Sequence, residues 1–304
     1  MFKLAHLSDI HLSPMPRAKR RELLSKRVIG YVNWHRGRKY VHRREILDLI
    51  TRDIVEQKPD HVAVTGDLVN LGLPEEFVRA AEWLHHLGPP SHVTAIPGNH
   101  DAYVRLHPAA GTGLWKPYME ANAAGEKLFP TPTERFPFVR RVGDVVLIAL
   151  SSAIPTMPFI AAGKVGTAQR KLLATALDRL KQANLFRVVL IHHPPESEPR
   201  RHRERLLDAS AFREALAKAG AEIVLHGHDH IGSVTWLEGP ARRIPGIGVP
   251  SASAATGGRW EPAGYNLYRI DGSANTWRCE MITRGFRAGG DKIGEIDRRV
   301  LLRV

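Results

Sequence analysis

Five short groups of residues in this chain combine histidine, aspartate and asparagine, side chains with which proteins bind divalent cations. In chain order the groups are Asp9-Ile10-His11, Gly66-Asp67, Gly98-Asn99-His100-Asp101, His192-His193-Pro194-Pro195 and Gly227-His228-Asp229-His230. Each group follows a run of aliphatic residues typical of a buried β-strand. A single Asp or His at a strand end is more often a loop cap than a ligand, whereas five such groups in succession favour a metal site.

The residue types indicate the chemistry of that site. Imidazole, carboxylate and amide ligands together favour Mn, Fe, Zn, Co or Ni over Ca or Mg, and they leave the choice among the transition metals open. Two such ions about 3.5 to 4 Å apart can polarise phosphoryl oxygens, lower the pKa of a bound water and stabilise the attacking and leaving oxygens. A shared carboxylate is needed to hold the two ions. We therefore expect a dinuclear centre that hydrolyses a phosphate ester or anhydride.

The segments between the groups must bring them to one place. Short aliphatic runs alternate with longer amphipathic stretches, which is the pattern of βαβ units. We predict strands at 3–7, 61–65, 92–96, 145–149, 186–191 and 222–225, helices at 44–56, 75–86, 167–182 and 211–219, and further strands within 233–238 and 265–281. Ligands in such folds gather at the carboxyl ends of the strands. In the first group, extended backbone would project Asp9 and His11 the same way.

In the type and order of these groups the chain resembles the calcineurin-like metallophosphoesterases, from Phe2 to about His230. The resemblance implies a four-layer α/β/β/α sandwich, which we expect to form one domain over residues 1–304. It also implies a dinuclear centre with seven protein ligands. Asp9, His11 and His230 resemble ligands of one metal ion, Asn99, His192 and His228 those of the other, and Asp67 the carboxylate that bridges them.

The resemblance also implies roles for the neighbours of these ligands. His100 matches a family histidine that contacts phosphate and can protonate the leaving oxygen, and Asp101 matches the acid that orients it. Asn99 and His100 are thus the expected substrate contacts, while His193 is expected to support the site without binding metal. The other histidines lack ligand spacing, and we interpret them as core or surface residues: His6, His35, His42, His61, His85, His86, His92, His107, His202 and His226.

Composition limits the class of protein. The chain has 304 residues, of which 43% are hydrophobic and 25% charged, so it can bury a substantial core and is not a disordered chain. Its single cysteine, Cys279, excludes an internal disulfide and every cysteine-cluster metal site. The first residues lack the pattern of a secretory signal, and no stretch approaches 18 consecutive apolar residues, so we expect a cytoplasmic protein whose membrane contact would be peripheral.

Most of the excess positive charge lies in one segment, residues 17–44, which we call the basic insert. It holds eleven lysines and arginines and one glutamate, a net charge of +10 within the chain's +13. Apolar residues alternate with these charges, as in segments that lie on anionic membranes, and we expect contact there with the inner face of the cell membrane.

Residues 104–134, rich in Ala, Gly and Pro, are a possible cap over the site. A C-terminal tail is expected from about residue 285.

The substrate is less determined than the reaction class. We expect hydrolysis of a phosphodiester or pyrophosphate bond by a metal-bound hydroxide. Residues 26–34 also resemble, more weakly, a branch that includes UDP-2,3-diacylglucosamine hydrolases, which implies a lipid-linked substrate. The alternatives are a soluble phosphodiesterase for cyclic nucleotides or other small diesters, and a nuclease whose binding would fall steeply with salt. A non-catalytic metal-binding scaffold is the alternative from another class, although all seven ligand positions are filled.

Overall fold

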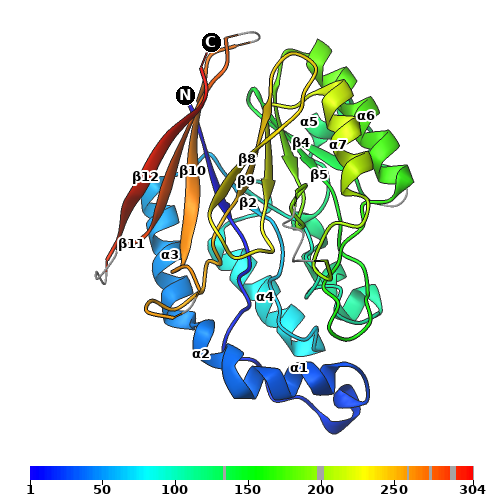
Figure 1. The fold of residues 1–304 in the computed structure, drawn as a ribbon, viewed down its shortest axis with the longest axis vertical. Helices are drawn as coiled ribbons and strands as arrows, with labels where there is room; N and C mark the ends of the chain where they lie inside the picture. The colour runs from blue at the N-terminus through cyan, green and yellow to red at the C-terminus, as the bar shows by residue number, and fades with distance from the viewer. Residues whose placement is uncertain (133–134, 197–201, 259, 274–275, 288–291, 304) are drawn as a thin grey trace.

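Two six-stranded sheets face each other in the computed structural model, which describes residues 1–132, 135–196, 202–258, 260–273, 276–287 and 292–303 (Figure 1). The first sheet has the order β12-β11-β10-β1-β2-β3 and the second the order β4-β5-β6-β7-β9-β8. Strands of the first sheet are β1 (Phe2–Leu7), β2 (His61–Val64), β3 (Val93–Ala95), β10 (Gly264–Asp271), β11 (Arg278–Phe286) and β12 (Ile293–Leu302). Those of the second are β4 (Phe138–Val142), β5 (Val145–Ala149), β6 (Phe186–Leu190), β7 (Ile223–His226), β8 (Ser233–Leu237) and β9 (Ile244–Gly248).

Helices cover the outer faces of both sheets, which confirms the four-layer α/β/β/α arrangement. The pairs α3 and α4 pack on the first sheet, and α6 and α7 on the second (Figure 1). The helices are α1 (Arg27–Asn33), α2 (Lys39–Val41), α3 (Arg44–Gln57), α4 (Pro74–Leu87), α5 (Ala123–Leu128), α6 (Thr167–Gln182) and α7 (Ala209–Ala219), with the short helical turns η1 (Arg20–Leu23), η2 (Trp34–Arg38), η3 (Pro108–Ala110) and η4 (Thr112–Tyr118). Among the described residues, no helix is long and apolar enough to cross a membrane.

The strands that precede the five groups run parallel within each sheet. In the first sheet β1, β2 and β3 are parallel, and in the second β5, β6, β7 and β9 are parallel. The remaining strands join the edges in antiparallel register. The groups thus leave parallel strands at their carboxyl ends, where ligands of open α/β sheets bind.

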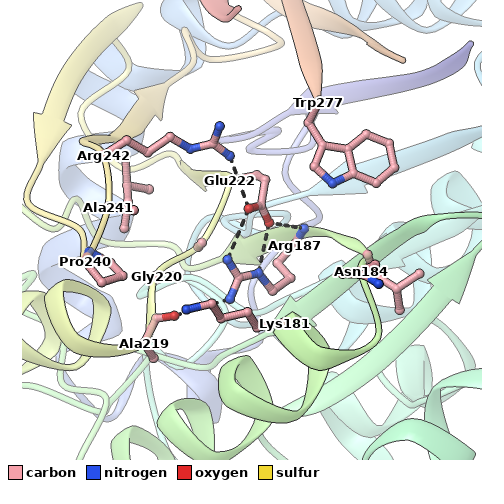
Figure 2. A pocket seen from close by; sticks show the side chains of 13 residues that line it. Lys181, Asn184, Arg187, Ala219, Gly220, Glu222, Pro240, Ala241, Arg242 and Trp277 are labelled. Carbon is pink, nitrogen blue, oxygen red and sulfur yellow. Dashed lines mark hydrogen bonds and ion pairs between the residues drawn. The ribbon is translucent and has the colours of Figure 1, made fainter. Parts of the chain in front are cut away.

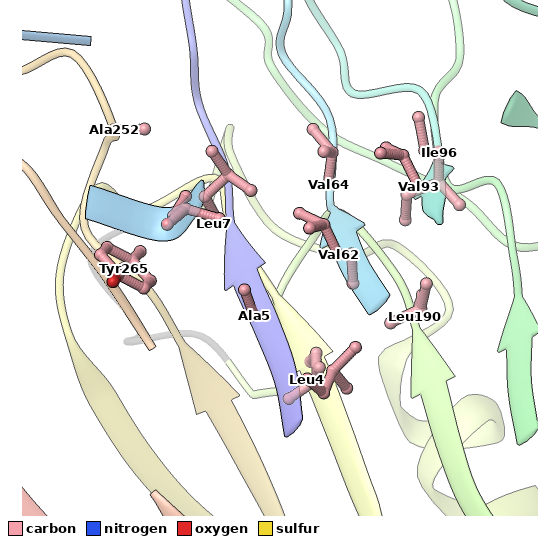
Figure 3. Packing of buried hydrophobic residues seen from close by; sticks show 14 of the residues in the cluster. Leu4, Ala5, Leu7, Val62, Val64, Val93, Ile96, Leu190, Ala252 and Tyr265 are labelled. Atoms are coloured by element: carbon pink, nitrogen blue, oxygen red, sulfur yellow. The ribbon is translucent and has the colours of Figure 1, made fainter. Parts of the chain in front are cut away.

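The aliphatic runs are explained by burial on both faces. In β5, Val145 and Leu147 join the cluster between the sheets, whereas Val146 and Ile148 join the cluster under α6 and α7. Strands covered on both faces lose the alternation of apolar and polar residues, which is why these segments read as continuous apolar runs. Figure 3 shows part of the cluster between the sheets, where Leu190 of β6 belongs to the same core as β1 and β2.

Three strands were not predicted from the sequence: β4, β9 and β12. Paired arginines break the apolar pattern of β4, and proline and glycine break that of β9. In the edge strand β12, exposed charged residues replace the apolar pattern. The stretch from about residue 285, where we expected a tail, contains the end of β11 and all of β12, which pairs with β11 in the first sheet.

Residues 104–132 pack against the core instead of forming a lid. Trp115 is fully buried, and its indole N–H donates to the Phe77 carbonyl on α4 over 3.0 Å. The buried Arg140 guanidinium of β4 donates to the Glu120 carbonyl at 2.6 Å and to the Val93 carbonyl at 2.7 Å. These bonds hold the segment to α4 and β3. Residues 133–134, the last two of the expected cap, lie outside the described residues.

A carboxylate on α3 ties that helix to the first sheet and yields a stability prediction. Asp53 accepts hydrogen bonds from Arg284 at 2.7 and 2.8 Å and from the Tyr265 hydroxyl. Burial opposes ionisation, but these donors outweigh it and lower the pKa of Asp53. Asp53→Asn should therefore lower the free energy of unfolding at pH 7 by about 2 kcal/mol in urea titrations.

The loss should shrink as the pH falls. A carboxyl whose pKa is lower in the folded state contributes stability above its unfolded pKa and loses it as the pH falls through the folded value. Asp48→Asn on the same helix is the matched control, because its pair with Arg44 is 42% exposed on each side. An equal loss in both variants, or a loss that does not change with pH, would contradict the assignment.

Candidate metal centre

Side chains from all five groups converge at the carboxyl ends of β1, β2, β3, β6 and β7. The loops that carry them are bonded to one another through the backbone: Asp9 N–H donates to the Gly66 carbonyl at 3.0 Å, and Gly227 N–H to the His192 carbonyl at 3.0 Å. Seven candidate ligands lie together there: Asp9, His11, Asp67, Asn99, His192, His228 and His230. Four of them, Asp9, His11, Asp67 and His192, are at most 2% exposed.

One part of the site is formed by Asp9, His11 and His230. The His230 Nε2 atom lies 3.1 Å from Asp9 Oδ1 and 3.3 Å from His11 Nε2. The other carboxylate oxygen of Asp9 accepts the His228 backbone N–H at 2.9 Å, which fixes the carboxylate plane. We call this group the first cluster.

The second cluster consists of Asn99, His192 and His228. The amide oxygen of Asn99 lies 3.0 Å from His192 Nε2 and 2.9 Å from His228 Nδ1. Asp67 stands between the clusters, with Oδ2 3.8 Å from His11 Nε2 and 3.5 Å from His192 Nε2. A carboxylate oxygen in this position faces both clusters, which is the arrangement that a bridging ligand requires.

The ring orientations fit cation binding. His192 Nδ1 donates to the Thr65 carbonyl at 2.7 Å, and His11 Nδ1 faces the Val69 carbonyl at 3.2 Å. A carbonyl can only accept, so these contacts put a proton on Nδ1 and turn Nε2 into the site, as in metal-binding histidines. There Nε2 of His192 faces the Asn99 and Asp67 oxygens. A cation at the second cluster would replace the proton that joins these atoms without it.

The backbone at the ligands is unusual and differs from our expectation. Asp9 and His11 do not extend the strand: their φ angles are 53° and 40°, in the left-handed region. Asp67, His228 and His230 share this conformation, with φ angles of 56°, 75° and 58°. Such residues cost of order 1–3 kcal/mol each and persist only where the surroundings hold them, so strain is concentrated at the ligands.

Two glycines permit the close approach of the ligand loops. A Cβ atom on Gly98 would collide with the Asp67 carboxylate and lie 2.6 Å from the Asp67 backbone nitrogen. Gly66 has a φ of 105°, and a Cβ there would lie 2.6 Å from the Gly98 nitrogen. The glycines next to Asp67 and Asn99 therefore allow the loops after β2 and β3 to touch.

Asp101 does not orient His100, contrary to our expectation. Its carboxylate accepts four backbone N–H groups at 2.8 to 3.1 Å, those of Gly98 and of residues 67–69. It thereby clamps the two ligand loops together, and its oxygens have no remaining contact with the His100 ring. The Asn70 carbonyl holds that ring instead, by accepting from Nδ1. Asn70 in turn is fixed through its side-chain bond to the Leu12 carbonyl at 3.0 Å.

His193 lies beside the second cluster with both ring nitrogens engaged. Nδ1 lies 2.7 Å from Ser152 Oγ, and Nε2 lies 3.0 Å from the Ala161 carbonyl. Its ring centroid is 4.4 Å from that of His228. The ring therefore packs against a candidate ligand while its own nitrogens are used elsewhere.

The electrostatics keep most of the rings neutral. Burial lowers the pKa of His228 to about 3 and that of His100 to about 4, and Arg38 adds to the effect on His100. Burial by itself would lower the pKa of His192 as well. The negative charge of Asp67 outweighs burial and raises the pKa of His192 to about 9. Burial opposes ionisation of Asp67, yet His192 and His100 outweigh it and lower the pKa of Asp67.

Sequence reasoning missed two residues of the site, Arg38 and His42, both in the basic insert. Arg38 Nη1 donates to His100 Nε2 at 3.2 Å, and its Nη2 lies 3.4 Å from both ring nitrogens of His11. His42 is 2% exposed, and its ring centroid is 4.3 Å from that of His11. The sequence held no helical signal for the pair, because Arg38 ends η2 and His42 lies in extended backbone beyond α2.

The basic insert reaches the site because it is fastened to the loop after β2. The Arg27 guanidinium donates to the Leu71 carbonyl at 3.1 Å and to the Gly72 carbonyl. Gly30 lies so close to this loop that a Cβ there would collide with Leu71 and approach the Tyr103 hydroxyl at 2.6 Å. The π-helical turn η2 follows, and π-turns of this kind are frequent at functional sites. It carries Arg38 to the clusters.

His230 of the first cluster, Asn99 and His228 of the second, and Asp67 line a cavity of about 1030 Å³. Residues between Asn33 and His42 line one part of it, and residues 255–258 another. Among the described residues of 104–134, the expected cap, none lines this cavity. The basic insert, and not residues 104–132, therefore lies over the cavity where we had expected the cap.

A second cavity, of about 280 Å³, lies at the opposite, amino-terminal ends of β6 and β7 (Figure 2). Its central charges are paired: Glu222 accepts from Arg187 at 2.9 Å and from Arg242 at 3.2 Å (Figure 2). Arg187 also donates to two carbonyl groups. Because these polar groups are satisfied within the protein, the candidate site is the larger cavity.

Comparison with known proteins agrees with this geometry. The family model for calcineurin-like phosphoesterases matches residues 2–232. The chain belongs to this family. A probable cyclic nucleotide phosphodiesterase of Synechococcus is 26% identical over 285 residues, 91% of each chain. A glycerophosphodiester phosphodiesterase of Enterobacter lignolyticus is 33% identical over 99 residues, and this match covers 32% of the present chain and only 29% of the relative.

Solved structures support the fold of this phosphoesterase. A dimetal phosphatase from Danio rerio superposes with a TM-score of 0.61 at 10% identity, covering 100% of the chain and 99% of the phosphatase. A purple acid phosphatase from yellow lupin gives a TM-score of 0.57 at 11% identity, covering 98% of the chain and 53% of the lupin protein. These likenesses show the fold, and the family match over residues 2–232 makes the chain a phosphoesterase.

The contact between Gly98 and Asp67 gives a prediction for metal binding by this phosphoesterase. Gly98→Ala should displace the Asp67 carboxylate, so that protein reconstituted with Mn and desalted retains fewer than two ions per chain by elemental analysis. Gly37→Ala is the control, because a Cβ at Gly37 meets nothing within 4 Å, and this variant should keep the wild-type metal content. Unchanged metal content in Gly98→Ala would contradict the role given to the glycine.

Proposed function

We propose that this phosphoesterase hydrolyses small phosphodiesters at a dinuclear centre held by the seven candidate ligands. The observation that carries the proposal is the Arg38 guanidinium in the same cavity. Burial lowers its pKa, but an arginine remains charged at neutral pH. Within the described part of the chain no carboxylate lies within ion-pair distance of Arg38, although the charges of Asp67 and Asp9 act on it from farther away. Its hydrogen-bonding neighbours are the rings of His100 and His11.

A partly buried cation that makes no direct ion pair is incompletely compensated, and an anionic ligand in the cavity would supply the missing partner. Guanidinium groups match phosphoryl oxygens with two parallel N–H donors. Arg38 would therefore bind a non-bridging oxygen of the substrate beside the metal clusters. This places the phosphorus atom between the basic insert and the loops that carry His100 and Asp67.

The metal ions, when bound, supply positive charge at the phosphoryl oxygens and lower the pKa of water. The protein's own contribution beyond the ligands is carried by His100. Its Nδ1 is held by the Asn70 carbonyl, and its Nε2 faces Arg38 and the cavity. Nε2 accepts from Arg38 in the ligand-free site, so it would first take up a proton as Arg38 turns to the phosphate. That proton could then pass to the leaving oxygen of the ester, and such a positioned acid typically contributes about 10²–10⁴ in rate. Asn99, whose amide oxygen lies in the second cluster, would contact the substrate from the same loop.

The size of the cavity and the relatives support a diester. A cavity of about 1030 Å³ leaves room for substituents on the phosphorus atom, and it lies at the upper end of the range for small-molecule sites. The two curated relatives described above are named as phosphodiesterases, one for cyclic nucleotides and one for glycerophosphodiesters. A soluble ester of either kind fits the proposal.

A lipid-linked pyrophosphate, such as UDP-2,3-diacylglucosamine, is the second candidate, favoured by an apolar surface on the basic insert. Leu24, Val28 and Val32 are 86%, 46% and 40% exposed and follow one another at intervals of four residues. A hydrogen bond of 2.8 Å joins the insert to the loop that carries the exposed Met157 and Phe159. Apolar side chains among basic residues match the surface of an anionic membrane, where each basic residue contributes about 1 kcal/mol.

A substrate panel tests both candidates. Protein reconstituted with Mn, Fe, Zn, Co or Ni is assayed on p-nitrophenyl phosphate, bis(p-nitrophenyl) phosphate, cyclic AMP, a glycerophosphodiester, single-stranded DNA and UDP-2,3-diacylglucosamine in micelles, with Asp67→Ala as the blank. We expect the small diesters to have the highest kcat/KM. If the lipid is preferred and the protein sediments with anionic liposomes, the second candidate replaces the first. Preference for DNA would indicate a nuclease, and no turnover with any metal a binding scaffold.

Removing the guanidinium should weaken transition-state binding without emptying the metal centre. Arg38→Ala should lower kcat/KM for the preferred diester by about tenfold to a hundredfold, which corresponds to about 1.5–3 kcal/mol. Arg38→Lys should recover part of the loss, because it restores the charge but not the two parallel donors. Lys39→Ala, at the next residue, is the matched control for charge, because Lys39 is not among the residues that line the cavity. Equal effects of Lys39→Ala and Arg38→Ala would indicate a general field effect and contradict the contact.

A further inference from the structure

A third imidazole, that of His42, faces the first cluster from the basic insert. No strand-end group contains it, because it lies between α2 and α3. One nitrogen of His42 and one each of His11 and His230 all lie within 4.8 Å of one another. Two nitrogen ligands on opposite sides of one ion are about 4 Å apart. The separations among these three nitrogens are therefore close to those of atoms that bind the same cation.

The orientation of His42 is fixed from behind. Its Nδ1 lies 2.9 Å from Ser253 Oγ, on the loop after β9. The backbone around it is anchored to the same loop, since Arg43 N–H donates to the Ser253 carbonyl at 2.9 Å and Ala255 N–H to the Val41 carbonyl at 2.8 Å. Metal-binding histidines are commonly held in this way through the ring nitrogen that does not bind the metal.

His42 lines the cavity described above, and its other ring nitrogen is Nε2. Among the described residues it has no hydrogen-bond partner, although the residue is 2% exposed. The ring centroid is 4.3 Å from that of His11 and 5.7 Å from that of His230. This nitrogen is therefore available to a ligand in the cavity, and the imidazoles of His11 and His230 lie beside it.

We propose that His42 Nε2 is an additional ligand of the cation held by Asp9, His11 and His230. This inference rests on the metal-binding part of the proposed function and is independent of the substrate. It makes the basic insert part of the metal centre. A cation bound at the first cluster would then hold the basic insert in place through His42. Arg38, four residues before His42, would be held beside His100 in the same way.

Cobalt binding provides a readout other than activity. Metal-free His42→Ala is titrated with Co(II) and compared with wild type, by calorimetry and by the visible absorption of the bound ion. We expect wild type to bind two ions and the variant to bind one of them at least tenfold more weakly, because even changes outside the ligand set cost 10–100-fold. The absorption bands of that ion should shift, and added imidazole should restore both affinity and spectrum.

His61→Ala is the matched control, because His61 of β2 is also buried but bonds to Thr94 of β3, away from the cavity. It should bind cobalt like wild type. His42→Gln keeps a polar side chain that can bond Ser253, and its thermal unfolding shows whether the fold is intact. If a folded His42 variant binds two cobalt ions with wild-type affinity and spectrum, His42 is no ligand. Failure of wild type to bind two ions would instead overturn the dinuclear centre itself.

Discussion

Asp67 is the carboxylate around which the centre is arranged. It is 2% exposed, lines the cavity and lies between two groups of imidazole, carboxylate and amide side chains. A buried carboxylate needs positive charge beside it, which His192 supplies in part and which bound cations would complete. The neighbouring Asp101 holds the backbone of Asp67 with hydrogen bonds, and the glycine before Asn99 leaves room for its side chain. Displacement of Asp67 would therefore disturb both clusters together.

The two sheets supply the rigidity that this arrangement needs. Five candidate ligands adopt left-handed backbone conformations that isolated chains avoid. They are held because the preceding strands are buried on both faces, and because the ligand loops bond to one another through their backbones. The fold thus offsets local strain with the packing of the sheets, and the strain lies where the chemistry is expected.

The basic insert changes the character of the cavity. A site of two metal clusters alone would bind many phosphate esters, whereas Arg38 adds a directional donor pair beside His100. The exposed apolar residues of the same insert lie at its outer side, so one segment combines an inner surface directed at phosphate with an outer surface suited to a larger partner. The substrate tests separate these two roles.

The sequence by itself determined the family, the layered fold and the group of seven candidate ligands, because metal ligation restricts residue types and buried parallel strands leave continuous apolar runs. It could not determine the loop geometry: Asp9 and His11 were expected in extended backbone, and Asp101 beside His100. Only the tertiary structure brought Arg38 and His42 to the site and packed Trp115 away from it. The physical reason is that these positions depend on contacts between segments far apart in the chain, such as Arg27 with the loop after β2 and His42 with Ser253.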